Sequence, residues 1–161
     1  EEIILEDDEI DSPWQRGVAY KILPGSIRCL EDVSKINLDE IDTIQEMPIQ
    51  SCISYIEKEG DKYKIHGYAY SSKPFVFPRV DVSIDGGKMW YIANINTEYE
   101  DLKKFKWSWC LWSIELEIPQ KTSHITCRAQ DDDGNVQPSE INDIWNIRGL
   151  ANNSCHSLED I

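Results

Sequence analysis

Positive charge is scarce in this chain. Its 161 residues include 16 Lys and Arg against 30 Asp and Glu, which gives a formal net charge of -14. Nucleic acids and anionic membranes are bound through patches of Lys and Arg, so this composition argues against both as partners. A small anion is also repelled at long range, and its binding would need a local group of cations. We expect most of the carboxylates to be solvated and to keep the protein soluble.

Paired cysteines and clustered histidines are absent as well. The five cysteines are widely spaced and form no C-x-x-C pair, which excludes a zinc knuckle and a thioredoxin-like site. Because His66, His124 and His156 are scattered, we expect no metal site in this chain. We expect reduced, structural thiols, as in an intracellular or organellar protein, with Cys110 and Cys127 inside strands.

Long hydrophobic runs are missing too. No stretch approaches the ~20 apolar residues of a membrane-spanning helix. The chain begins with Glu1 and Glu2 rather than Met, so any targeting peptide is expected to have been cut away or left out. These residues therefore leave the compartment open.

The first 46 residues show no sustained strand pattern. The stretch from Glu1 to Asp11 is strongly acidic and is typical of a loop or a frayed end. The stretch from Ser12 to Glu46 is interrupted by proline and glycine. Apolar residues between Val33 and Ile44 have a weak helical spacing that extended packing explains equally well. We expect an irregular segment that packs against a larger body.

From Met47 onward, apolar and polar residues alternate over short segments, as in half-buried strands. Asp85-Gly86-Gly87 fits a tight hairpin between two of these segments. The expected strands cover residues 49–56, 63–70, 80–85, 89–95, 106–118, 124–131 and, as the last strand, Ile141 to Ile147. About seven such strands predict an all-β fold, an immunoglobulin-like sandwich of two antiparallel sheets. The Cys…Trp…Cys pattern of antibody domains is missing, so the prediction concerns the architecture only.

Three features of these segments allow more than one interpretation. Trp107, Trp109 and Trp112 would line a ligand-binding wall or fill the core and an interface, and we favour core plus interface. The inward face of their strand changes near Leu111 and Trp112, which predicts a bulge. The acidic run from Asp131 to Asn135 resembles a calcium loop. Its glycine is fourth rather than sixth, so we favour a turn between strands.

Several short motifs follow one another along the chain. They are Met47-Pro48-Ile49-Gln50-Ser51, Gly67-Tyr68-Ala69-Tyr70-Ser71, Arg79 to Gly87, Trp107 to Trp112, Arg128 to Asp131, Gly134 to Pro138, Trp145-Asn146-Ile147-Arg148-Gly149 and Asn152 to His156. In this order and spacing they resemble the C-terminal dimerisation domain of the sulfite oxidase family of molybdenum enzymes. The resemblance extends over roughly Ser12 to His156.

The resemblance implies that this chain is part of an oxidoreductase that converts sulfite to sulfate. Residues 1–46 would be an acidic tail and the C-terminal remnant of the molybdenum-cofactor domain, and residues 47–161 the dimerisation sandwich. The implied partners are a second copy of the chain and the upstream molybdenum domain, with a mitochondrial or peroxisomal location. Molybdenum–molybdopterin belongs to the full-length parent, whose ligating cysteine lies upstream. We therefore expect this chain alone to bind no cofactor and to be inactive.

Two residues carry the implied site. Arg148 is the substrate-binding candidate, because the arginine of the family's W-N-x-R-G run reaches into the substrate pocket. Its forked guanidinium donors match the oxygens of sulfite or sulfate. Without the resemblance, an arginine paired with a nearby carboxylate is the simpler interpretation. Tyr20 is the catalytic candidate, since Ser12 to Arg16 and Tyr20 to Pro24 resemble the end of the molybdenum domain, whose tyrosine contacts the active site. Its alternative is an ordinary packed or surface aromatic residue.

The sequence departs from the family pattern at a few positions. Ser72 to Phe75 replaces a glycine-rich run that ends in arginine, which predicts a stiffer and less cationic loop. Cys155 replaces a tryptophan and Ser157 a basic residue, which predicts altered packing near the chain end. One extra residue lies between Trp14 and Tyr20.

Two other functions stay open. The dimerisation domain of assimilatory nitrate reductase has the same motifs, although Met47 to Ser51 and Trp14 to Arg16 are more similar to the sulfite-oxidising branch. A non-enzymatic β-sandwich for adhesion or scaffolding is an alternative from a different class of protein.

Overall fold

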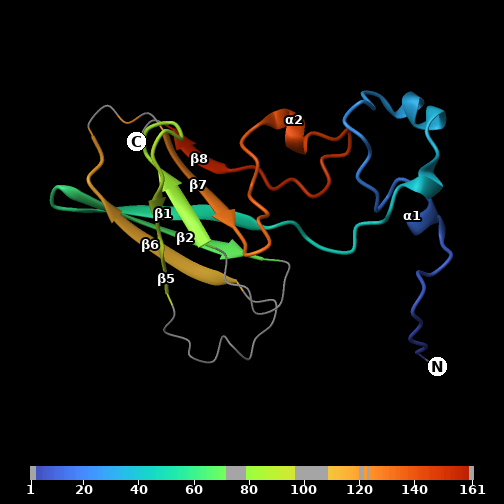
Figure 1. Ribbon diagram of the computed structural model, residues 1–161, viewed down its shortest axis with the longest axis horizontal. Helices are drawn as coiled ribbons and strands as arrows, with labels where there is room; N and C mark the ends of the chain where they lie inside the picture. Colours follow the sequence, from blue (N-terminus) through green and yellow to red (C-terminus); the bar gives the residue numbers. More distant parts are fainter. Residues whose placement is uncertain (1–2, 72–78, 97–108, 120–121, 123, 160–161) are drawn as a thin grey trace. The chain divides into compact units, whose positions relative to one another are not determined.

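The chain divides into two compact units (Figure 1). The N-terminal unit comprises Glu1–Glu46 and Trp145–Asn152, and the sandwich unit comprises Met47–Ile144 and Asn153–Ile161. The assignment of residues 1–46 to the end of a molybdenum domain, and of 47–161 to a dimerisation domain, stays a prediction. The computed structural model describes residues 3–71, 79–96, 109–119, 122 and 124–159.

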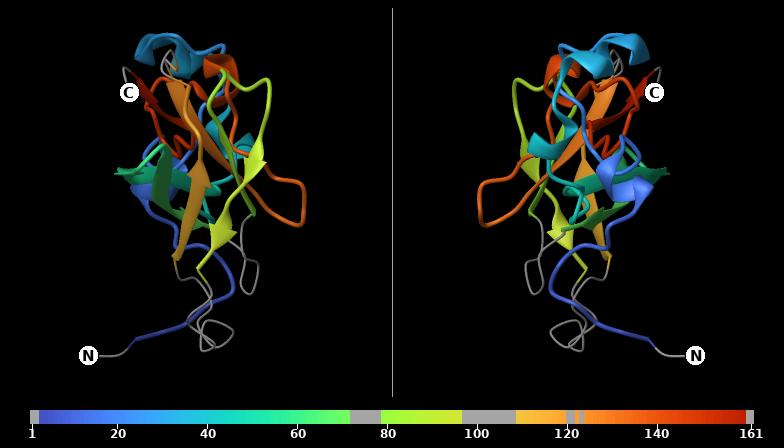
Figure 2. Two further views of the ribbon diagram at one scale, coloured as in Figure 1. Left: turned by 90° about the vertical axis from the view of Figure 1, so that its left-hand side faces the viewer. Right: turned by 90° about the vertical axis from the view of Figure 1, so that its right-hand side faces the viewer.

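The sandwich unit contains two four-stranded antiparallel sheets (Figures 1 and 2). The first, called the β2 sheet, has the strand order β1-β2-β6-β5. Its strands are β1 (Gln50–Glu59), β2 (Lys62–Tyr70), β5 (Asn94–Ile95) and β6 (Cys110–Leu116).

The second sheet, called the β3 sheet, has the strand order β4-β3-β7-β8. Its strands are β3 (Arg79–Ser83), β4 (Tyr91–Ile92), β7 (His124–Gln130) and β8 (His156–Glu159). The predicted all-β sandwich of two antiparallel sheets is therefore confirmed.

The core lies between the sheets and is formed by alternate residues of the central strands. Ile65 and Ala69 of β2, together with Val80 and Val82 of β3, have no exposed surface. The inward residues of β7 are Ile125, Cys127 and Ala129, all fully buried. The period of two in the sequence thus placed the inward faces of these three strands correctly.

Gly67 makes room for the largest core side chain. It lies opposite Trp112 in the β2–β6 register, and the Trp112 side chain is fully buried. A Cβ atom on Gly67 would come within 2.2 Å of both the Trp112 ring and the carbonyl oxygen of Cys52. The indole Nε1 donates to the Tyr68 carbonyl oxygen at 3.0 Å, so the N–H group of this buried ring has a hydrogen-bond partner.

Two of the strand predictions are wrong. The predicted strand 89–95 is divided between β4 of the β3 sheet and β5 of the β2 sheet. Residues Ile141 to Ile147 form no strand, because Ile141–Ile144 is the short helix α2 and the next residues form a loop. Ile141 and Ile144 have a spacing of three, which fits a helical turn, and Ile141 is exposed. The last described strand is β8, which pairs with β7.

The predicted bulge near Leu111 and Trp112 is also misplaced. The β2–β6 register runs without a shift from Tyr63↔Leu116 to Ala69↔Cys110. Leu111 faces outward, and this apolar residue on the outer face was mistaken for a change of the inward face. The described irregularity lies in β1, between Ile53 and Tyr55. Of the predicted strand 106–118, residues 106–108, including Trp107, lie outside the described residues, as does the Ser72 to Phe75 loop.

One turn prediction is confirmed, and the prediction of a tight hairpin is correct only in its glycine conformations. Gly86 and Gly87 both have positive φ, but the loop between β3 and β4 is longer than a two-residue hairpin. In the second turn, the Asp131 Oδ1 accepts from the backbone N–H groups of Asp133 and Asn135 at 3.1 and 2.9 Å. This carboxylate therefore shapes a turn, as expected.

The five cysteines are free. Burial raises the pKa of Cys110 to about 11 and, as the main cause, that of Cys127 to about 12. Both thiols stay protonated at neutral pH, which agrees with a structural role.

Candidate functional site: the Arg148 loop

The loop that carries Arg148 is organised by the buried side chain of Asn146. The Asn146 Oδ1 accepts from the backbone N–H groups of Arg148 and Leu150, at 3.2 and 3.1 Å. Its Nδ2 donates to the Leu150 carbonyl oxygen at 2.9 Å. One side chain thus replaces the backbone ladder that a strand would have supplied here.

Gly149 and Ala151 let the loop turn back on itself. Gly149 has a φ of 63° and Ala151 a φ of 53°, both in the left-handed region that favours glycine. No atom lies within 4 Å of where a Cβ on Gly149 would be. The backbone conformation favours glycine at this position, and space around it is not the constraint.

The Arg148 guanidinium is exposed and has a neutral partner. Its Nη1 donates to the Val18 carbonyl oxygen at 3.2 Å. Among the described residues, no carboxylate forms an ion pair with it. A guanidinium has five N–H donors, so an incoming oxyanion would meet donors that no described carboxylate neutralises.

Tyr20 belongs to the same unit as Arg148, two residues beyond Val18. Its ring centroid is 6.3 Å from that of Trp14, and its carbonyl oxygen accepts from the Ile44 N–H at 2.7 Å. The side chain is about half exposed and borders a shallow depression of roughly 330 Å³ that Gln15 also lines. The structure therefore brings the two predicted site residues into one unit. The described contacts include no hydrogen bond between their side chains.

A second cation of this unit was not singled out from the sequence. The Arg28 guanidinium carbon lies 4.3 Å from the ring centroid of Trp145, where the loop begins. Such cation–π contacts hold a guanidinium without neutralising it. Arg28 and Trp145 are far apart in sequence, so no local pattern indicates the contact.

Lys21 fixes the segment next to Tyr20. Its buried ammonium group donates to the carbonyl oxygens of Leu38 and Ile41, both at 2.6 Å. The backbone of Lys21 also bridges to that of Thr43. The unit is otherwise built from short pieces: helix α1 (Pro13–Arg16) and the 3₁₀ helices Leu30–Lys35 and Leu38–Glu40.

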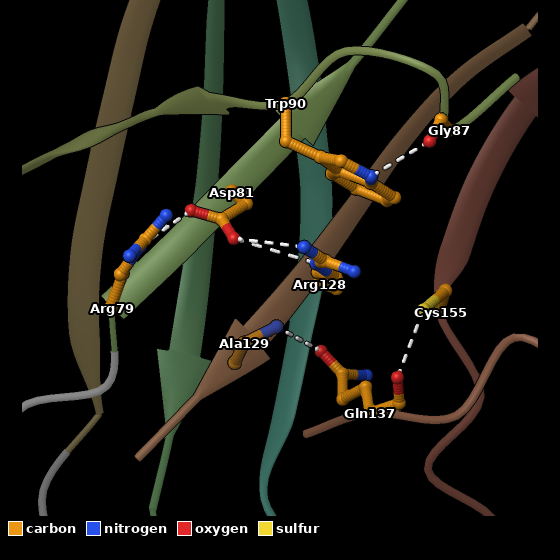
Figure 3. Close-up of polar contacts among 8 residues, drawn as sticks. All are labelled: Arg79, Asp81, Gly87, Trp90, Arg128, Ala129, Gln137 and Cys155. Atoms are coloured by element: carbon orange, nitrogen blue, oxygen red, sulfur yellow. Dashed lines mark hydrogen bonds and ion pairs between the residues drawn. The ribbon is translucent and has the colours of Figure 1, made fainter. Parts of the chain in front are cut away.

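The sandwich unit has a buried polar cluster that the sequence analysis missed (Figure 3). Asp81 is 1% exposed and accepts from Arg79 Nε at 2.7 Å and from Arg128 Nη2 at 3.3 Å. The Arg128 guanidinium lies 3.9 Å from the ring centroid of Trp90, whose Nε1 donates to the Gly87 carbonyl oxygen. The alternation predicted correctly that Asp81 faces outward. It gave no sign that the loop between β3 and β4 would cover it.

Gln137 is a second buried polar group of this unit (Figure 3). Its Oε1 accepts from the Ser51 hydroxyl at 2.5 Å and from the Ala129 N–H at 2.8 Å. Its Nε2 donates to the carbonyl oxygens of Asn153 and Ser154. One amide therefore links strands β1 and β7 to the segment that leads into β8.

No group of three or more His, Cys, Asp or Glu side chains in the described part of the chain could hold a metal ion. The described helices also include none long and apolar enough to cross a membrane.

Comparison with known families gives one model that covers most of the chain. Residues 41–159 match the model of the Mo-co oxidoreductase dimerisation domain. This range includes the sandwich unit up to Glu159 and the Arg148 loop.

Relatives extend the similarity to the N-terminal unit. The mitochondrial sulfite oxidases of Mus musculus and Homo sapiens are 38% and 36% identical to the chain over 97% of its length. The chain spans only 29% of each of these proteins. A nitrate reductase of Phaseolus vulgaris is 38% identical over 56% of the chain. Among solved structures, the sulfane dehydrogenase SoxCD of Paracoccus pantotrophus has the same fold. Its TM-score is 0.64 at 22% identity, and the match covers 94% of this chain and 36% of that one.

Proposed function

This chain belongs to the Mo-co oxidoreductase dimerisation domain family, and we propose that it is the C-terminal part of a sulfite oxidase-type enzyme. In this proposal the sandwich unit holds two copies of the enzyme together. The Arg148 loop supplies a cation to the substrate pocket of the molybdenum domain.

The observation that carries the proposal is the state of the Arg148 side chain. A buried asparagine fixes its backbone, and its guanidinium contacts only a neutral carbonyl oxygen among the described hydrogen-bond partners. Sulfite and sulfate are small oxyanions, and charge-assisted bonds to a guanidinium are among the stronger hydrogen bonds. In a chain of net charge -14, such a cation matters more for anion binding than it would in a neutral protein.

The test uses the full-length enzyme. Arg148→Met is expected to raise KM for sulfite by about tenfold or more, because it removes one charge-assisted contact worth roughly 1.5–3 kcal/mol. Arg16→Met is the matched control, since Arg16 is an exposed arginine of the same unit and is already paired with Asp11. An unchanged KM in Arg148→Met, with the control also unchanged, would remove Arg148 from the pocket.

Tyr20 is proposed to hydrogen-bond the bound substrate through its hydroxyl group. Its half-exposed side chain and its position two residues from the Arg148 contact support this role. Tyr20→Phe keeps the ring and removes the hydroxyl, so we expect a lower kcat with little loss of stability. A kcat equal to that of the parent enzyme would rule the role out.

Self-association is tested on the chain itself. Light scattering at tens of micromolar is expected to give twice the 18.7 kDa mass of one chain. A monomer under these conditions would contradict the proposal. The molybdenum–molybdopterin group, which supplies the redox chemistry when bound, is assigned to sequence outside this chain. By similarity to the named mammalian relatives, the proposed location is mitochondrial, with a peroxisome as the alternative.

A second candidate is the same domain of a nitrate reductase. The match to the Phaseolus vulgaris enzyme favours it, although that match covers a smaller share of the chain than the sulfite oxidase matches. Assaying the full-length protein with sulfite and with nitrate separates the two. Sulfite oxidation without nitrate reduction is the expected result. A lack of both activities would favour a non-enzymatic interaction module.

A further inference from the structure

The outward face of the β2 sheet carries a cluster of aromatic and apolar side chains. Tyr68 of β2 lies opposite Leu111 of β6, and Tyr55 of β1 lies opposite His66. Trp109 and Leu111 are each 55% exposed, and Tyr55 is 51% exposed. We call this surface the aromatic face; its members are Tyr55, His66, Tyr68, Tyr70, Trp109 and Leu111.

The rings of the aromatic face are already packed against one another. Trp109 meets Tyr68 edge-on, with ring centroids 4.8 Å apart, and its centroid is 5.5 Å from that of Tyr70. Tyr55 stacks on His66 at 4.4 Å. Side chains held in this way lose little further freedom when a partner covers them, which lowers the entropy cost of binding.

The charges beside the aromatic face are mixed in sign, which suits contact with a second copy of this acidic chain. Glu57, Lys64 and Glu115 lie side by side across β1, β2 and β6, so both signs are present within a few ångströms. Two copies of a chain with net charge -14 repel each other over most of their surface. This repulsion is reduced at a face that has an aromatic centre and charges of both signs nearby.

The exposed area is appropriate for the centre of a dimer contact. Aromatic side chains bury roughly 150–250 Å² each, so half-exposed Trp109 and Tyr55 offer on the order of 200 Å². A standard interface buries about 800 Å² per partner, with aromatic residues concentrated at its core and a polar rim around them. These two rings thus supply about a quarter of the area of a standard contact.

We propose that the aromatic face is covered by the same face of a second copy of this chain, in a two-fold contact centred on Trp109 and Leu111. This inference rests on the proposed self-association and names the surface responsible. In a two-fold contact each residue of the face occurs twice, once in each copy, so one substitution acts at two places.

The experiment compares two exposed aliphatic residues, one on each sheet. Leu111→Asp puts a carboxylate into the aromatic face, and Ile92→Asp puts one on the outward side of β4, where Ile92 is 62% exposed. Sedimentation equilibrium of the chain is expected to show a dissociation constant at least 100-fold weaker for Leu111→Asp. For Ile92→Asp it should change less than threefold. Trp109→Ala, which adds no charge, is expected to weaken association about 30-fold.

The outcomes separate the two claims. If Leu111→Asp and Trp109→Ala both remain dimeric, the aromatic face is not the contact surface, and the proposal of self-association stands. Dissociation by Ile92→Asp alone would move the contact to the β3 sheet. A parental chain that is monomeric would overturn both claims, and would leave the upstream molybdenum domain as the occupant of this face. Circular dichroism spectra and melting temperatures close to those of the parent show that each variant is folded, so that a change in association reports on the face.

Discussion

The two sheets of the sandwich differ in what covers their outward faces. The centre of the β3 sheet is covered by its own chain, since Asp81 and Ser83 face outward and yet are almost fully buried, whereas Ile92 on the edge strand β4 stays exposed. The loop that follows β3 folds back over them, with Trp90 on Arg128 and the Gly87 N–H donating to the Ser83 hydroxyl at 2.8 Å. The β2 sheet leaves Trp109, Leu111 and Tyr55 exposed instead.

Under the proposed two-fold contact, the two sheets would serve different purposes, one stability and the other association. On the β3 sheet, polar groups are satisfied inside the unit, so a partner would gain little by covering them. On the β2 sheet, the described part of the chain leaves apolar rings in water. Changes on the first face should therefore alter stability, and changes on the second should alter association.

The largest predicted effect is on the outward face of the β3 sheet. Asp81→Ala leaves Arg79 and Arg128 without their shared carboxylate, and breaking a buried pair typically costs 3–5 kcal/mol. Because both arginines are partly exposed, we expect a smaller loss of about 2–3 kcal/mol in the free energy of unfolding. Urea denaturation of the folded chain measures it.

Thr126→Ala is the control for this prediction. Thr126 is on the same outward face, and its hydroxyl makes one exposed hydrogen bond with Ser157 at 2.8 Å. We expect a change below about 1 kcal/mol for it. Equal losses for both variants would mean that the cluster around Asp81 adds nothing to the closure of this face.

The next largest effect is expected when the Trp90 ring is removed and the ion pairs of Asp81 are kept. Trp90→Ala takes away the ring that lies 3.9 Å from the Arg128 guanidinium and leaves Asp81 in place. A cation–π contact of this kind contributes about 0.5–2 kcal/mol, so we expect a loss of about 1–2 kcal/mol in urea denaturation. The dissociation constant of the dimer should stay as in the parent, and a weaker dimer would show that this face takes part in association.

The sequence predicted the inward faces and missed what covers the outward ones, for a physical reason. Alternation with a period of two depends only on neighbours in the chain, so the inward positions of β2, β3 and β7 could be predicted. Asp81 is covered by Arg128, a residue 47 positions away, and by a loop whose path no local pattern encodes. The exposed Leu111 was misinterpreted for the same reason, because an outward apolar residue was taken as a change of face.

The candidate site shows the same limit. Arg148 and Tyr20 were found through motifs, whereas the Val18 carbonyl oxygen and Arg28 were not, because backbone acceptors and cation–π partners leave no sequence signature. The last-strand prediction failed where Asn146 takes over hydrogen bonds that a strand would have made.

A smaller effect is expected on the aromatic face of the β2 sheet. Tyr55→Ala removes a ring that is 51% exposed and stacked on His66 at 4.4 Å. Since Tyr55 lies beside the centre of the proposed contact, we expect about a tenfold weaker dimer, equivalent to about 1.4 kcal/mol. Sedimentation equilibrium measures it, with Lys58→Ala on the same strand as the control. A dimer as tight as the parent would confine the contact to the region around Trp109.

The smallest effect concerns Asp85, in the turn that begins the loop between β3 and β4, and it depends on pH. The Met89 N–H at 2.9 Å, with the Ser83 hydroxyl and the Lys88 N–H, holds the pKa of the Asp85 carboxyl below its usual value. A carboxyl whose pKa is lowered by folding stabilises the protein above its unfolded pKa, about 3.9, and this contribution is lost as pH falls through the lower folded pKa. The difference in urea midpoint between the parent and Asp85→Asn should therefore be constant above about pH 5 and shrink below about pH 4. Because Asp85 is exposed, the difference should be slight at every pH. A difference that grows on acidification would mean that this carboxylate opposes the fold of that loop, and the covering of the outward face of the β3 sheet would then depend on Trp90 and Asp81 alone.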